Sequence, residues 1–148
     1  MDNQLIVLRT LAVSLRTFKN FTGDNDVQVQ CVQTFLEIAM GTSTLSMDNI
    51  ARIINLEQST ASRNIKKLAA GPKAQPGYGL ISIELDREDM RRRILKLTPR
   101  GYALVKAIED ATVPTLAHHF NSKAHMALEK ASIRDIEEVS GSGPEEPV

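Results

Sequence analysis

Apolar residues recur along this chain at two spacings, and the change from one to the other divides the chain into elements. Residues 4 to 18 and residues 27 to 41 place apolar side chains three and four positions apart, which predicts two amphipathic helices. Turn-forming residues at positions 21 to 26 separate these two helices. The N-terminal third of the chain is therefore expected to be helical.

Two shorter helical periods follow directly, over residues 47 to 56 and residues 58 to 68. Ser46 is a good N-cap for the first helix, and Asn55 is expected to close it. The second helix places three apolar residues on one face: Ala61, Ile65 and Leu68. Two short helices in immediate succession predict a helix-turn-helix.

An alternating pattern then replaces the helical one. Residues 80 to 86 alternate and are rich in β-branched side chains, residues 87 to 92 form a charged turn, and residues 93 to 97 return as a second strand. Thr98 and Pro99 signal a new helix, because threonine caps free amides and proline at the first helical position loses no needed hydrogen bond. We therefore expect a mainly α fold with a small β-hairpin wing, a winged helix-turn-helix.

The helical period resumes from Tyr102, and Pro114 is expected to break or bend this fifth helix. Thr115 would then cap a sixth helix. These C-terminal helices and the first helix carry more apolar surface than a small winged module can cover, which favours a helical dimer interface. The alternative is that they cover their own subunit.

The length of 148 residues fits one domain with a modest core. We expect that domain to span residues 1 to 139. Its dimerisation and scaffold helices would occupy residues 4 to 41 and 99 to 136, and the winged helix-turn-helix lobe residues 46 to 98. The last stretch, residues 140 to 148, has little apolar content and is expected to be a disordered tail.

Formal net charge is zero, but the charge is unevenly distributed. Residues 52 to 100 hold 11 Lys and Arg against 5 Asp and Glu, a net charge of +6, and the remainder of the chain carries −6. A basic middle suits contact with phosphates, and the neutral sum limits indiscriminate binding. The alternative is that these charges are only a solvated surface.

The candidate DNA-binding residues lie on the second helix of the helix-turn-helix and on the wing. On that helix Ser59, Arg63 and Lys66 point away from the apolar face, with Thr60, Ser62 and Lys67 flanking them. On the wing the candidates are Arg87, Arg91 and Arg92.

Three segments carry a resemblance to a known family. They are the second-helix sequence of residues 58 to 63, the wing tip of residues 86 to 91, and the helix start of residues 97 to 101. Together they resemble the MarR family of bacterial winged-helix transcription regulators. The resemblance implies a homodimer built from N- and C-terminal helices, recognition helices in successive major grooves and a wing arginine in the minor groove. It also implies release from DNA by small aromatic ligands or oxidants, as in many members.

The sequence departs from the family pattern in two places. At the wing tip Met90 stands where the family has its first arginine, so Arg91, Arg92 and Arg93 follow in a row. Between the recognition helix and the wing, the stretch from residue 71 to 79 looks like an insertion, and the segment of residues 69 to 79 is expected to be a loop because it holds three glycines and two prolines. Lys73 in this stretch would contact phosphate, or the loop would serve another partner.

The sequence gives little support for a redox, metal-binding or catalytic function. One cysteine, Cys31, excludes an internal disulfide, and its place on an apolar face predicts a buried, inert thiol in a reducing compartment rather than a peroxide sensor. His118, His119 and His125 lack metal-ligand spacing and are expected to face solvent or an interface. We see no catalytic set, phosphate loop or cofactor motif, and expect no enzyme, metal or cofactor.

The N-terminus has no basic leader, and Arg9 interrupts its apolar run, so we expect neither a signal peptide nor a membrane span. The expected protein is therefore a cytoplasmic, sequence-specific, duplex-DNA-binding transcription regulator. It would be a repressor that acts as a homodimer on a pseudo-palindromic operator, with a small aromatic effector. The alternative is a protein-interaction module without specific DNA binding, and salt-dependent binding to DNA distinguishes the two.

Overall fold

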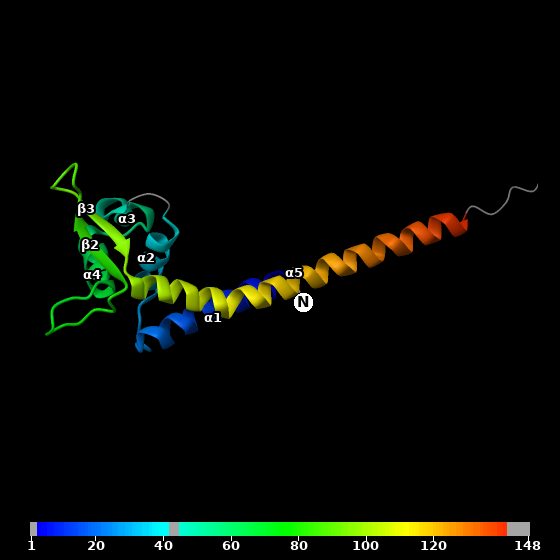
Figure 1. The fold of residues 1–148 in the computed structure, drawn as a ribbon, viewed down its shortest axis with the longest axis horizontal. Coiled ribbons are helices and arrows are strands. Elements are labelled where there is room, and N and C mark those ends of the chain that lie inside the picture. Colours follow the sequence, from blue (N-terminus) through cyan, green and yellow to red (C-terminus); the bar gives the residue numbers. More distant parts are fainter. Residues whose placement is uncertain (1–2, 42–44, 142–148) are drawn as a thin grey trace, which may run out of the picture.

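The computed structural model describes residues 3–41 and 45–141 of the chain. A lobe of short helices and a small sheet lies at one end, and one long helix extends away from it (Figure 1). The elements in chain order are α1 (Asn3–Thr22), α2 (Val29–Met40), β1 (Leu45–Ser46), α3 (Met47–Ile53), α4 (Gln58–Leu68), β2 (Ile81–Leu85), β3 (Arg93–Leu97) and α5 (Pro99–Gly141).

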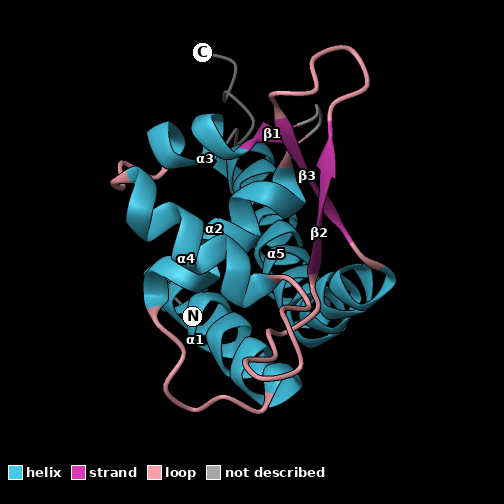
Figure 2. Ribbon diagram, turned by 90° about the vertical axis from the view of Figure 1, so that its left-hand side faces the viewer, coloured by secondary structure: helices cyan, strands magenta, loops and turns pink. Residues whose placement is uncertain are grey.

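The helix-turn-helix and the wing form as the sequence predicts. Helix α4 has the predicted bounds, and β2 and β3 pair as an antiparallel hairpin with Ile83 opposite Leu95. Asn55 closes α3 as expected, because it adopts a left-handed backbone conformation with φ of 52°, but the helix ends at Ile53 and does not reach residue 56. The sheet has a third strand that the sequence did not predict, the two-residue β1, which pairs with β3 in the order β1-β3-β2 (Figure 2).

Two predicted caps are present. The Ser46 hydroxyl accepts a hydrogen bond from the Asn49 amide at 3.2 Å, which caps α3. The Thr98 hydroxyl accepts from the Gly101 amide at 3.1 Å and donates to the Gly79 carbonyl at 2.7 Å. The start of α5 is therefore bonded to the segment that precedes β2.

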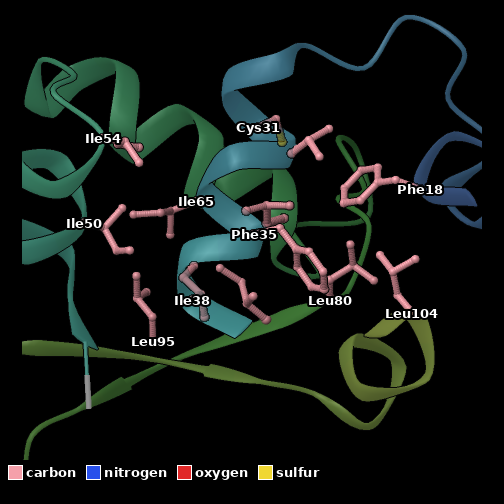
Figure 3. Close-up of a cluster of buried hydrophobic side chains, with 13 residues drawn as sticks. Phe18, Cys31, Phe35, Ile38, Ile50, Ile54, Ile65, Leu80, Leu95 and Leu104 are labelled. Carbon is pink, nitrogen blue, oxygen red and sulfur yellow. The ribbon is translucent and has the colours of Figure 1, made fainter. Parts of the chain in front are cut away.

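One apolar cluster joins the lobe to α1 and α5. Side chains from every helix and from β3 contribute to it, together with Leu80 and Ile81 at the start of β2 (Figure 3). Phe18 of α1 and Phe35 of α2 are fully buried and meet edge to face with their ring centroids 5.6 Å apart. Burial of each such large side chain contributes about 1.5 to 3 kcal/mol. This cluster fixes α4 and the hairpin relative to the long helix.

The C-terminal half differs from the prediction of two helices separated at Pro114. A single helix, α5, runs through Pro114, which is exposed. Residues on both sides of the proline pack against α1: Thr112 and His119 are buried, and Asn3 at the start of α1 lies 3.2 Å from the His119 ring nitrogen. Packing against α1 thus outweighs the hydrogen bond that proline removes.

The predicted tail is wrong at its first two positions, because α5 continues through Ser140 and Gly141. The remainder of that stretch, residues 142 to 148, lies outside the described residues.

Candidate nucleic-acid interface

Helix α4 exposes a polar face beside the core. Its apolar residues Ala61, Ile65 and Leu68 are buried, whereas Ser59, Arg63 and Lys66 are exposed, and Thr60 and Ser62 are half-buried. The Gln58 side-chain amide donates to the Asp48 carboxylate at 2.8 Å, which ties the first turn of α4 to α3. The helical period therefore predicted correctly which side chains of α4 face the core and which face solvent.

Lys67, unlike Arg63 and Lys66, forms an ion pair with a carboxylate among the described residues. Its ammonium lies 3.4 Å from the Asp24 carboxylate and 5.6 Å from the centroid of the Tyr78 ring. Asp24 belongs to the turn between α1 and α2, and Tyr78 to the segment before β2. Lys67 thus points toward the α1–α2 turn with its charge paired, which the period of the helix alone does not reveal.

The wing tip is held closed by its own backbone and by two carboxylates. The Asp86 amide donates to the Arg92 carbonyl at 2.9 Å, and the Arg92 amide donates to the Asp89 carbonyl at 2.9 Å. The Asp86 carboxylate accepts from the Glu88 amide at 3.0 Å, and the Asp89 carboxylate accepts from the Arg91 amide at 3.1 Å. These aspartates therefore shape the turn.

The wing arginines carry charge that this turn does not use. Arg87, Arg91 and Arg92 are all exposed, and none of them forms an ion pair with a residue in the described part of the chain. Arg91 and Arg92 also line a shallow hollow against the first turn of α3, opposite Asp48 and Asn49. The wing thus presents free cations next to the helix-turn-helix.

The segment of residues 71 to 79, which we call the insertion loop, projects from the lobe on the side of α4 opposite the wing tip (Figures 1 and 2). Between it and α4 lies an open groove of about 690 Å³. Its lining residues include three cations and no carboxylate: Arg63, Lys66, Lys67, Ala69, Gly71, Pro72, Gln75, Pro76, Gly77 and Ile83.

Sequence reasoning missed the contacts that hold this loop. The Tyr78 hydroxyl donates to the Asp24 carboxylate, and the Arg100 guanidinium donates to the Tyr78 carbonyl at 2.9 Å. Arg100 also lies over the Phe21 ring, 4.7 Å from its centroid, so this cation of the basic middle region has a structural role. No local pattern connects residues so far apart in the chain.

Cys31 and the three histidines differ in their surroundings. Cys31 is fully buried, and this burial raises the pKa of its thiol to about 11, as expected for an inert cysteine. His118 is exposed and His125 lies 3.1 Å from the Glu129 carboxylate, but the expectation for His119 was wrong, because it is buried against Asn3. Within the described residues no three metal-ligating side chains come together, and no helix has the length and apolarity to cross a membrane.

Comparisons with protein-family models and with curated proteins gave no match. Comparison with solved structures gave many. The DNA complex of MepR from S. aureus is 20% identical, with a TM-score of 0.59, over 88% of this chain and 96% of MepR. The transcriptional regulator Tm0710 from Thermotoga maritima is 14% identical, with a TM-score of 0.58, over 93% of this chain and 96% of its own.

A third similar structure is the MarR family transcription regulator SP03579, which is 20% identical with a TM-score of 0.52. The matched region covers 95% of this chain and 88% of that protein. At these identities the likeness establishes the fold. The chain has the winged-helix fold of MarR-family regulators.

Proposed function

We propose that this protein is a sequence-specific duplex-DNA-binding transcription regulator, a repressor that acts as a homodimer on a pseudo-palindromic operator. The observation that carries the proposal is the polar face of α4, where Ser59, Arg63 and Lys66 are exposed. Helix α4 itself lies between the two projecting loops (Figure 1). The MepR structure, which shares this fold, is itself a complex with DNA.

The geometry of α4 suits the major groove, which is about 12 Å wide and admits a helix. Arg63 can form two parallel hydrogen bonds to a guanine edge, and hydroxyl side chains such as Ser59 bond either to bases or to phosphates. Among the described residues the Arg63 guanidinium has one hydrogen-bond partner, the Thr60 hydroxyl at 3.4 Å, so it is available for a base. Arg87, Arg91 and Arg92 on the wing would contact the backbone or the minor groove.

Exposed apolar residues on α1 and α5 support the homodimer. Leu8 on α1 is 61% exposed, and Phe120 on α5 is 55% exposed. Beyond the lobe, α5 carries further exposed apolar side chains over a stretch that no other described element covers: Met126, Leu128, Ile133 and Ile136. A two-fold pairing through these helices would bury this surface and present two copies of α4 to successive half-sites.

A small aromatic effector that releases the protein from DNA is part of the proposal through the resemblance in sequence. The proposed activity would place the protein in the cytoplasm. The competing function is a protein-interaction module, in which the winged lobe binds a partner protein and the basic residues are incidental.

Selection of binding sites from a pool of random duplexes tests the proposed function. A two-fold symmetric consensus, with affinity that falls steeply as salt rises, is expected for a dimeric regulator. Failure to enrich any sequence, together with weak and salt-insensitive binding, would favour the protein-interaction module.

Sedimentation velocity tests the dimer separately. We expect the unmodified chain to sediment as two copies, and Phe120→Glu to shift it toward one copy, because a carboxylate would be buried in an apolar interface. Met90→Glu, which changes an exposed apolar residue of the wing tip, is the matched control. A monomer in the unmodified chain would contradict the proposed assembly.

A further inference from the structure

Backbone hydrogen bonds join the base of the insertion loop to the end of α4. The amides of Tyr78, Leu80 and Gly79 donate to the carbonyls of Lys67, Leu68 and Ala69 at 2.8, 2.7 and 3.2 Å, respectively. A helix leaves its last carbonyls without partners inside the helix, and here the returning loop supplies them. The position of the loop is therefore set by the helix that carries the candidate DNA-binding residues.

Two glycines permit the backbone conformation of this loop. Gly71 has a φ of 66°, a conformation that side chains other than glycine rarely adopt. At Gly77 an added Cβ would lie 1.8 Å from the Ala69 carbonyl oxygen. The Gly77 amide also donates to the Ala70 carbonyl at 2.9 Å, which closes the neck of the loop.

The loop forms one wall of a groove whose other wall is the basic side of α4. Arg63 and Lys66 face the groove from α4, and Pro72, Gln75 and Pro76 face it from the loop. Lys73, which is exposed, adds another cation on the loop itself. No ion pair within the described residues involves Arg63, Lys66 or Lys73, and no carboxylate lines the groove. The chemistry of this groove is complementary to an anion.

The position of the groove indicates which kind of anion it would bind. Arg63 and Lys66 belong both to the groove and to the exposed face of α4, so the two surfaces are continuous. The wing tip and the insertion loop project on opposite sides of α4, away from the free end of α5 (Figures 1 and 2). If α4 occupies the major groove, the phosphates of a DNA strand beside that groove would run along this continuous surface.

We propose that the insertion loop acts as a second wing. In this arrangement the groove holds the phosphodiester backbone that flanks the half-site, Lys66 and Lys73 neutralise phosphates, and the loop wall excludes water from one side. This inference rests on the proposed DNA-binding function. It assigns to this chain a backbone contact on the side of α4 that the hairpin wing does not reach.

Two variants test the second wing. Lys73→Ala removes one exposed charge and leaves the loop intact. In the second variant two glycines replace residues 71 to 76, so that the existing bond from the Gly77 amide to the Ala70 carbonyl becomes the closing bond of a β-turn. Lys106→Ala, on the exposed side of α5, is the charge-matched control.

The readouts are fluorescence anisotropy on the selected duplex over a range of salt, and hydroxyl-radical footprinting. For Lys73→Ala we expect the slope of log K against log salt to fall by about 0.9, which is about a fivefold loss of affinity at 0.15 M salt. The shortened loop should lose at least as much and should also lose backbone protection outside the half-sites. The selected consensus and the behaviour of Lys106→Ala should not change.

The outcomes separate the inference from the proposed function. If the unmodified protein binds no duplex, the proposed function fails. If it binds its selected site while Lys73→Ala and the shortened loop keep the full slope and the full footprint, the second wing is overturned and the regulator remains. Circular dichroism of the shortened variant detects misfolding, and Lys73→Ala keeps the test decisive in that event.

Discussion

The Tyr78 hydroxyl donates a hydrogen bond to the carboxylate of Asp24, 54 residues earlier in the chain. Lys67 of α4 lies against both partners, at 3.4 Å from the carboxylate and 5.6 Å from the ring centroid. The same ring meets Phe18 of the core edge to face, with the centroids 6.2 Å apart. The insertion loop, the end of α4 and the α1–α2 turn are thus joined at one polar contact on the core.

Replacing Tyr78 by phenylalanine should loosen the insertion loop and leave its anchoring ring in place. Tyr78→Phe keeps the contact with Phe18 and removes only the hydroxyl that Asp24 accepts. We expect faster amide exchange over residues 71 to 79 and a small decrease in the unfolding midpoint. Hydrogen exchange read by mass spectrometry measures the first effect. Tyr102→Phe, at a tyrosine that is 64% exposed, is the control and should change neither quantity.

The same contact should weaken in acid. The Tyr78 hydroxyl, the Asp26 amide and Lys67 hold the pKa of Asp24 below its ordinary value of 3.8. A carboxyl whose pKa is lower in the folded state stabilises that state above its unfolded pKa, and this contribution disappears as the pH falls through the folded pKa. Exchange over residues 71 to 79 should therefore accelerate below about pH 4, relative to the core.

Asp24→Asn provides the comparison for the acid experiment. This variant has no titrating carboxyl at the contact, so its loop should exchange at a rate that changes little with acid once the intrinsic pH dependence is removed. An equal acid response in the unmodified chain and in Asp24→Asn would assign the effect to another group.

The parts of the fold that the sequence predicted are those with local causes. The bounds of α4 and the caps at Ser46 and Thr98 follow from residues within one or two turns of each other. The exposed positions of Arg63 and Lys66 also have a local cause, since the helical period alone determines which face of α4 is exposed to solvent.

The parts that were missed depend on distant partners. Helix α5 passes through Pro114 because α1 packs beside it, and His119 is buried because Asn3 lies against it. Lys67 turns toward Asp24, 43 positions away, and β1 is too short to show any alternation. Each of these features needs a contact between segments that no periodicity within one segment contains.

Cys31 should resist thiol reagents in the folded protein. It is fully buried, and with a pKa of about 11 only about one thiol in a thousand is ionised at pH 8, against about one in four for a free cysteine. An aromatic disulfide reagent should label it slowly in buffer and quickly in guanidinium chloride, with Cys31→Ser as the blank. Rapid stoichiometric labelling in buffer would show that the interior around α2 opens locally.

Arg63→Ala should distinguish base readout from phosphate contact on α4. If Arg63 bonds to a base edge, the selected duplex should lose about 1 to 3 kcal/mol of binding free energy, and random duplexes should lose less. Fluorescence anisotropy on both duplexes gives the difference, with Arg16→Ala, at an exposed arginine of α1, as the charge-matched control. Equal losses on the two duplexes would assign Arg63 to phosphate.

At the wing tip, Arg91→Ala should weaken binding to selected and unselected duplexes alike. The Asp89 carboxylate accepts the Arg91 amide, and the Arg92 amide and carbonyl both bond within the turn, so the backbone of the two arginines is fixed while their side chains remain exposed. A phosphate contact by Arg91 predicts that the salt slope decreases by about one unit, because one neutralised phosphate is lost. Arg92→Ala, at the next position in the same turn, is the comparison and should lower the slope less than Arg91→Ala. If Arg92→Ala lowers the slope and Arg91→Ala does not, the wing reaches DNA one residue later, and the correspondence with the family at Met90 shifts by the same amount.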